Sequence, residues 1–347
     1  MQILFLSFYS PRAPRDKNTL LGLRKRGVRV FEVVSARAGL RKYVDIAKEY
    51  QRARRADAVI VGYQSGFLVP LARLLGWGKM LVYNAGNPQY DGLVLDRGIY
   101  PEGTLRARFV WWMDWLAFRA ANVVLLETEA QIEYVTREFG IPRAKLLRVW
   151  TGADGEVFHP DAGVQKKQPF LVVFRGFFVP ATGVEQVLEA ARLLKDENIS
   201  FRLIGRGPLS PKVEQTIREQ GLSRVEIISQ YLTDDEMRTA MLEGEILLGQ
   251  FGGHERLERT IQHKTFEALA LGVPFITGRT KSNEELLGDG ETVQFVSLNS
   301  SEELAEAIRS LAINDSLRAS LGAHGRELFL RLLQPEQIVA ELAKRIA

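Results

Sequence analysis

Residues 249–278 hold the densest group of side chains that could do chemistry. Arg259, Lys264 and Glu267 lead into an apolar stretch, and Lys264 and Glu267 are three residues apart, so both can lie on one face of a helix near its start. A cation and a carboxylate placed in this way could hold a diphosphate and a ribose diol, respectively. The same spacing also fits an ordinary ion pair on a helix surface.

Two glycine-containing segments each follow a predicted strand. Gly183 stands just before a predicted helix, where free N–H groups and the positive end of the helix dipole favour a phosphate. The segment 205–208, Gly-Arg-Gly-Pro, would let a ligand approach the backbone closely. An ordinary loop between strand and helix is the alternative for the first segment, and a simple turn is the alternative for the second. Both are of interest because ligands of open parallel sheets bind at the carboxyl ends of the strands.

Several kinds of site are absent from the sequence. The chain has no cysteine, and its four histidines include no pair at i, i+4, so thiolate chemistry is excluded and a histidine-built zinc site is disfavoured. No Asp-x-Asp triplet occurs, and we therefore expect neither a metal nor another cofactor. The loop after the first predicted strand lacks G-x-G-x-x-G, and no G-x-x-x-x-G-K-[ST] occurs, which disfavours nicotinamide dehydrogenases and P-loop enzymes.

Alternating strands and helices must position these residues. Short apolar strands are predicted at 2–8, 28–34, 58–62, 80–83, 122–126 and 146–150, with amphipathic helices between them. A second series of the same kind begins at residue 170. Strands that are apolar along their whole length indicate parallel sheets covered by helices on both faces.

The length of 347 residues fits two such domains. We predict an α/β protein with a Rossmann-like domain at 1–158, a polar linker at 159–169 and a second Rossmann-like domain at 170–334. The C-terminal helix, 335–347, is predicted to join the first domain.

Charge is unevenly spread along the chain. Residues 1–158 carry 24 Lys and Arg against 15 Asp and Glu, whereas the remainder is net acidic. A basic helix predicted at 42–55, together with Arg24, Lys25 and Arg26, could bind an anionic membrane surface, or it could be a solvated face. We expect no nucleic-acid partner, because tryptophans 111, 112 and 115 lie mostly at the spacing of a helix core. No segment is long and apolar enough to span a membrane, so the predicted location is cytoplasmic, with peripheral binding at the inner face of the membrane as a further hypothesis.

Six segments in a fixed order resemble the GT-B nucleotide-sugar glycosyltransferases, most closely their retaining family 4 group. They are Val149–Asp154 with Phe158-His159-Pro160, Phe174–Gly183, Val184–Ala191, Gly205–Pro208, Lys264–Pro274 and Glu284–Gly290. The resemblance covers nearly the whole chain and implies two Rossmann-like domains facing across a cleft.

The resemblance also implies roles for individual residues. Glu267 would bind the donor ribose, Arg206 and the turn around Tyr231 would lie near the base, and the helix after Gly183 would face the phosphates. Gly205 and Thr182 belong to the matching loops.

The chain departs from the family pattern at several of these positions. The Arg and Lys that often clamp the diphosphate are Phe177 and Thr182 here, and Arg259 stands where a Glu often touches the donor sugar. We therefore expect Arg259 and Lys264 to form the clamp instead. The first domain also lacks the histidine common after its fourth strand.

Other residues could take over the sugar-side roles. His254 and Glu255 could take part of the role of the missing histidine. Asp91 could orient an acceptor hydroxyl, or it could simply be a turn residue.

The sequence thus predicts a metal-independent hexosyltransferase. Its partners would be a nucleoside-diphosphate sugar donor and a sugar, glycolipid or polysaccharide acceptor, and retention of configuration is the expected outcome. Two alternatives remain open: a GT-B binding or scaffold protein that has lost catalysis, and an inverting or epimerase relative of the same fold.

Overall fold

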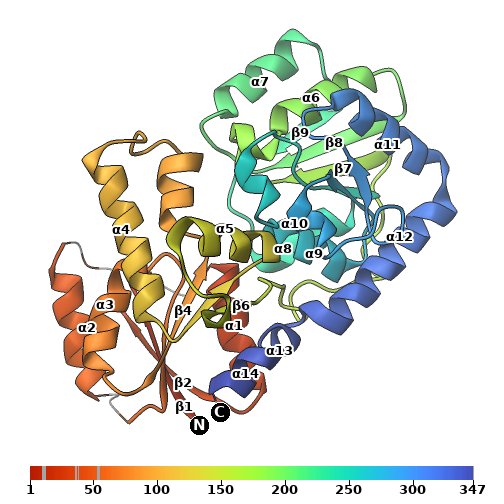
Figure 1. Ribbon diagram of the computed structural model, residues 1–347. Coiled ribbons are helices and arrows are strands. Elements are labelled where there is room, and N and C mark those ends of the chain that lie inside the picture. The colour runs from red at the N-terminus through yellow and green to blue at the C-terminus, as the bar shows by residue number, and fades with distance from the viewer. Residues whose placement is uncertain (10–12, 36, 38, 53–54, 347) are drawn as a thin grey trace. The chain divides into compact units, whose positions relative to one another are not determined.

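A computed structural model describes residues 1–9, 13–35, 37, 39–52 and 55–346. The chain divides into two compact units, and each is described by itself below (Figure 1). Unit 1 comprises Met1–Gly152 and Leu333–Ala347, and unit 2 comprises Ala153–Leu332.

The predicted linker, 159–169, lies inside unit 2 instead of between the units. The Lys167 amide donates to the Glu243 carbonyl at 3.0 Å, and Lys166 Nζ donates to the Gly244 carbonyl at 2.6 Å. These hydrogen bonds attach the segment to unit 2, although its polar composition suggests a linker between domains.

Unit 1 is built on a parallel sheet whose described strands run in the order β2-β1-β3-β4-β5-β6. The strands are β1 (Gln2–Ser7), β2 (Arg29–Val34), β3 (Ala58–Val61), β4 (Met80–Gly86), β5 (Val123–Leu126) and β6 (Leu146–Arg148). All of them except β2, at the sheet edge, are largely buried, as their uninterrupted apolar sequences predict.

The helices of unit 1 cover both faces of this sheet. They are α1 (Pro14–Lys25), α2 (Arg41–Arg52), α3 (Val69–Leu75), α4 (Leu105–Ala120), α5 (Glu129–Phe139), α13 (Pro335–Ile338) and α14 (Ala340–Ile346). Because β1 to β2 and β2 to β3 run in opposite directions across the sheet, right-handed connections place α1 and α2 on opposite faces. One apolar cluster joins α2, α3, α4 and α5 to Leu4 and Leu6 of β1. Residues 53–54 of the predicted basic helix lie outside the described residues.

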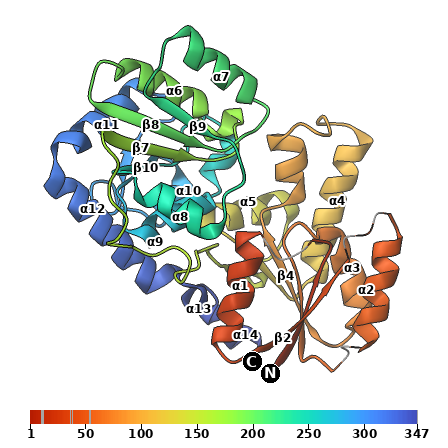
Figure 2. The same ribbon diagram turned by 180° about the vertical axis from the view of Figure 1, so that it is seen from behind.

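The C-terminal segment returns to unit 1 through α13, which packs against α1 (Figure 2). A side chain could not replace Gly22 of α1 there, because a Cβ atom would lie 1.9 Å from the Pro335 carbonyl oxygen. This close approach explains how two segments about 310 positions apart in the sequence share one unit.

Unit 2 repeats the architecture with the order β12-β11-β10-β7-β8-β9 in its described part. Its strands are β7 (Phe170–Arg175), β8 (Ile199–Ile204), β9 (Val225–Ile228), β10 (Ile246–Leu248), β11 (Phe275–Gly278) and β12 (Gln294–Val296). Its helices are α6 (Val184–Leu193), α7 (Ser210–Glu219), α8 (Asp234–Leu242), α9 (His263–Leu271), α10 (Lys281–Glu284), α11 (Ser301–Ile313) and α12 (Asp315–Leu328). The order reverses beside β7, so the loops after β7 and β10 open at a topological switch point, where ligands of such sheets bind.

Candidate active site

The loops after β7 and β8 are held together by glycines at the carboxyl end of the unit 2 sheet. The Gly176 amide donates to the Ile204 carbonyl at 3.0 Å, and a Cβ atom on Gly205 would lie only 1.9 Å from the Gly176 oxygen. Gly205 also has φ +149°, a conformation that residues with a Cβ rarely adopt. The predicted close approach at Gly205 is therefore to a neighbouring loop of the protein.

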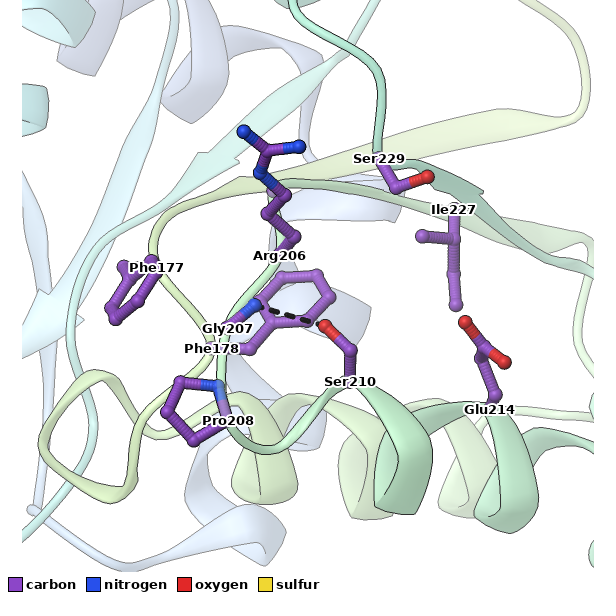
Figure 3. A pocket seen from close by; sticks show the side chains of 10 residues that line it. Phe177, Phe178, Arg206, Gly207, Pro208, Ser210, Glu214, Ile227 and Ser229 are labelled. Atoms are coloured by element: carbon purple, nitrogen blue, oxygen red, sulfur yellow. Dashed lines mark hydrogen bonds between the residues drawn. The ribbon is translucent and has the colours of Figure 1, made fainter.

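An open pocket of about 530 Å³ lies beside these glycines (Figure 3). Its lining includes the aromatic residues Phe177 and Phe178, Arg206 and the polar side chains of Ser210, Glu214 and Ser229. The Gly207 amide donates to Ser210 Oγ at 2.9 Å, which fixes the turn at the start of α7. Flat apolar surfaces with polar groups at the margin suit a planar heterocyclic ligand.

The sequence prediction finds only part of this pocket. Arg206 and Gly205 line it, and the placement of Arg206 near a nucleotide base stays a prediction. Tyr231 is 86% exposed and is not part of the lining, although Ser229, two residues earlier, is. Sequence reasoning missed Ser210 and Glu214; their position in the first turns of the helix that follows Gly205–Pro208 is the signal that could have found them.

Buried charged groups lie on the other side of Gly176. A Cβ atom on Gly176 would be 3.4 Å from Lys264 Nζ, so the amine is close to the glycine that supports the pocket. Lys264 is buried, donates to the Gly249 carbonyl at 2.5 Å and lies 4.3 Å from the centre of the Phe174 ring. The pocket and the lysine thus belong to one continuous region of unit 2.

Glu267 forms an ion pair with a residue that is distant from it in the sequence. Its Oε2 accepts a hydrogen bond from Arg175 Nη1, the last residue of β7, in a mostly buried ion pair. Lys264 and Glu267 both lie in α9, but both are buried, so they do not form the solvent-exposed i, i+3 pair of the alternative interpretation. Arg175 is a further candidate site residue, and its position at the carboxyl end of a central strand points to it.

The surroundings lower the pKa of three basic side chains in this cluster, so their charged forms are disfavoured. Burial lowers the pKa of Lys264 well below its ordinary value, and the charge of Arg175 lowers it further. Burial lowers the pKa of Arg175 to about 10, although the Asp234 carboxylate opposes this. Burial, with Arg175 and Lys264, lowers the pKa of His263 to about 3. Such a region would be stabilised by an anion.

Arg259 is buried and pairs with a carboxylate at the surface. Its Nη1 donates to Glu255 Oε1 at 2.7 Å, and Glu255 is exposed. His254 caps the short helix Glu255–Glu258 by accepting from the Arg256 amide at 3.2 Å. His254, Glu255 and Arg259 therefore form one local structure at the carboxyl end of β10.

The start of α6 is packed against the segment after β10. Gly183 has φ +74°, and a Cβ atom on it would lie 2.6 Å from the Gly252 nitrogen. The Thr182 hydroxyl donates within its own loop, to the carbonyls of Phe177 and Val179 at 2.9 and 2.8 Å. Thr182 thus shapes the loop, while the helix N-terminus supplies N–H groups directed away from the helix.

Asp91 belongs to unit 1 and is fully buried at the start of the π-helical turn Asp91–Asp96. It lies near Asp114, whose pKa is raised to about 7 by burial, with a smaller contribution from the Asp91 charge. Its role toward an acceptor stays a prediction. Among the described residues, no group of three or more His, Asp or Glu side chains could hold a metal ion.

A family model described as glycosyl transferases group 1 matches residues 158–328. The MMP alpha-(1->4)-mannosyltransferase of Mycolicibacterium hassiacum is 23% identical over 83% of this chain and 72% of its own length. An uncharacterized glycosyltransferase of Methanocaldococcus jannaschii is 29% identical over 45% of this chain. The match spans 42% of the length of that relative, which is less than half.

Solved structures resemble the chain over its whole length. The Anabaena protein HepE, solved in complex with UDP, has a TM-score of 0.76 and 16% identity, with 100% of this chain and 99% of that chain covered. Sucrose-phosphate synthase of Thermosynechococcus elongatus has a TM-score of 0.80 and 16% identity, with 99% and 98% covered. The predicted fold class is confirmed. The chain has the GT-B fold, and its residues 158–328 match the glycosyl transferases group 1.

Proposed function

We propose that this glycosyltransferase moves a hexose from a nucleoside-diphosphate sugar to a sugar, glycolipid or polysaccharide acceptor, with retention and without a metal. The observation that carries the proposal is the junction at Gly176, where an open pocket adjoins Lys264 and the Arg175–Glu267 pair. A base in the pocket would place the ribose near Glu267 and the diphosphate near the cations.

Each group then has a chemical task. Arg175 engages Oε2 of Glu267, and the other carboxylate oxygen can accept from a ribose hydroxyl. Lys264, Arg259 and the N-terminus of α6 would stabilise the negative charge that develops on the diphosphate as its bond to the sugar breaks. The acceptor oxygen bonds to the anomeric carbon, and its proton passes to the departing phosphate.

The comparisons support this choice of donor and reaction class. HepE was solved with UDP and with UDP-glucose, and relatives are named as a mannosyltransferase and, in Streptomyces kanamyceticus, an alpha-D-kanosaminyltransferase. Those names belong to the other proteins. For this chain they favour sugar transfer from an activated nucleotide.

Calorimetric titration with uridine and guanosine diphosphates and their hexose conjugates tests donor binding. An assay of diphosphate release with candidate acceptors, followed by NMR of the product anomer, tests transfer and retention. We expect transfer activity to survive excess EDTA. If activity is lost completely in EDTA and is restored by manganese or magnesium, the metal-independent clamp is contradicted. Binding without hydrolysis or transfer to any acceptor would instead favour the scaffold alternative.

A further inference from the structure

The outer face of α4 in unit 1 carries an exposed apolar stripe. Leu105, Phe109 and Trp112 are 83%, 55% and 47% exposed, and they lie at i, i+4 and i+7, so they occupy one side of the helix. The opposite side is buried through Ala107, Val110, Ala117 and Phe118. Spacing alone predicts a core position for Trp112, but the helix is apolar on both faces and only one of them meets the sheet.

The stripe is a preformed aromatic surface. The Phe109 ring stacks on Phe67 from the turn before α3, with centroids 6.1 Å apart and an interplanar angle of 14°. Its other neighbour is Trp112, 6.4 Å away between ring centroids. Side chains held in this way lose little conformational freedom when they are buried by a partner.

The charges beside the stripe are positive. At about 100° per residue, Arg106 lies on one side of the stripe and Arg108 and Arg119 lie on the other, and all three are exposed. The only acid in α4 is Asp114, which is buried and accepts from the Tyr90 amide at 2.7 Å. An exposed carboxylate, Glu102, precedes the helix. Exposed leucine, phenylalanine and tryptophan between arginines form the pattern of helices that lie in a membrane interface.

The predicted basic helix, α2, is less suited to this role. Its cations are interspersed with Asp45 and Glu49, and Asp45 pairs with Arg37 at 3.3 Å. No described helix is long and apolar enough to cross a bilayer, so insertion would be limited to the interface.

We propose that the stripe of Leu105, Phe109 and Trp112 docks unit 1 on an anionic lipid surface. The three apolar side chains enter the boundary between headgroups and acyl chains, while Arg106 and Arg108 contact lipid phosphates. The proposal goes beyond the proposed transfer reaction and does not depend on it, because docking is measured without a donor.

The test is sedimentation of the whole chain with phosphatidylglycerol-phosphatidylcholine vesicles at low salt. The parent should bind, and the double variant Phe109→Ser, Trp112→Ser should bind at least about tenfold more weakly. Arg106→Gln with Arg108→Gln should also weaken binding, and added salt should reduce the difference from the parent.

Trp77→Ser is the matched control, because Trp77 is 80% exposed, follows α3 and lies outside the stripe. It should bind as the parent does, and circular dichroism should show all variants folded. The proposal is wrong if the parent ignores anionic vesicles or if the stripe variant binds equally well. It is also wrong if sedimentation equilibrium shows that the parent dimerises through the stripe, so that a second copy is the occupant.

Discussion

Lys264 is a buried amine near the Arg175 guanidinium, and it has one hydrogen-bonded carbonyl partner among the described contacts, that of Gly249. A diphosphate would supply the missing negative charge. Lys264→Met keeps the volume and removes the charge, so it should weaken nucleoside diphosphate binding by roughly tenfold to a hundredfold, since charge-assisted hydrogen bonds contribute about 1.5–3 kcal/mol. Binding of the nucleoside without phosphate should change little.

The same calorimetric series separates the neighbouring roles. Arg259→Ala should resemble Lys264→Met, and Arg259→Glu should be worse, because it places a carboxylate near the diphosphate. Glu267→Ala should weaken both ligands, since both carry the ribose. Arg309→Ala is the control, because that residue forms surface ion pairs with Glu197 and Glu306 on the outside of unit 2. If Arg259→Glu binds the donor as the parent does, the clamp lies elsewhere and Arg175 becomes the first candidate.

Proton linkage gives a second prediction at Lys264. Because burial lowers its pKa well below the ordinary value, the amine loses its proton at a lower pH than an exposed lysine. A diphosphate prefers the protonated amine, so donor affinity should fall as pH rises through that lowered pKa, and binding should take up protons there. Calorimetry in buffers of different ionisation enthalpy measures this uptake. Lys264→Met should abolish it, and uptake that persists in the variant would assign it to another group.

The residues of the site were more predictable than their partners. Lys264 and Glu267 stand in a recognisable segment, but the partner of Glu267 is Arg175, which is 92 positions earlier. That pairing depends on how β7 and β10 lie side by side and on the orientation of α9, which the spacing of residues within one helix does not reveal. Likewise, Thr182 was placed in the correct loop, but the direction of its hydroxyl depends on the turn geometry.

At the scale of elements, the loops after β7 and β8 are a single unit because Gly205 allows them to touch. Gly205→Ala must displace the Gly176 carbonyl and should cost several kcal/mol of unfolding free energy, together with loss of nucleoside binding. Gly221 is the matched control: its φ is +61°, but a Cβ atom there would meet nothing within 4 Å. Gly221→Ala should therefore cost only about 1 kcal/mol and leave binding unchanged. Urea unfolding and nucleoside titration of both variants test this contrast, and equal effects would contradict it.

The strands were the most predictable elements, because most are short, largely apolar segments between turn residues; β2, with Arg29 and Glu32, is an exception. Strand 123–126 agrees with the predicted strand, 122–126, to within one residue. Elements that depend on tertiary contacts were not foreseen, including the π-helical turn Asp91–Asp96 and the attachment of 159–169 to unit 2. The segment 159–169 is held by partners distant in sequence, since Lys166 and Lys167 donate to the carbonyls of Gly244 and Glu243, and composition carries no information about such contacts.

At the scale of the whole molecule, the two units should respond to pH in opposite directions. In unit 1, burial raises the pKa of Asp16 to about 6 and that of Asp114 to about 7. These groups contribute stability that is fully present below their ordinary pKa of 3.8 and is lost as pH rises through 6 to 7. In unit 2, the pKa of His263 is lowered from 6.5 to about 3, so its contribution is present above pH 6.5 and is lost as pH falls toward 3.

The tryptophans allow these two responses to be measured separately in the intact chain. All five, at positions 77, 111, 112, 115 and 150, belong to unit 1, so their fluorescence reports its unfolding, whereas circular dichroism reports both units. Between pH 5 and 8 the fluorescence midpoint should fall by a few degrees, and Asp114→Asn should flatten that fall, since one pKa unit corresponds to about 1.4 kcal/mol. Between pH 6.5 and 4 the transition seen only by circular dichroism should move down instead, and His263→Gln should reduce that movement. The prediction is wrong if the midpoints from both probes shift together in the parent and in both variants. The buried carboxyls and the histidine would then not govern the stability of their own units.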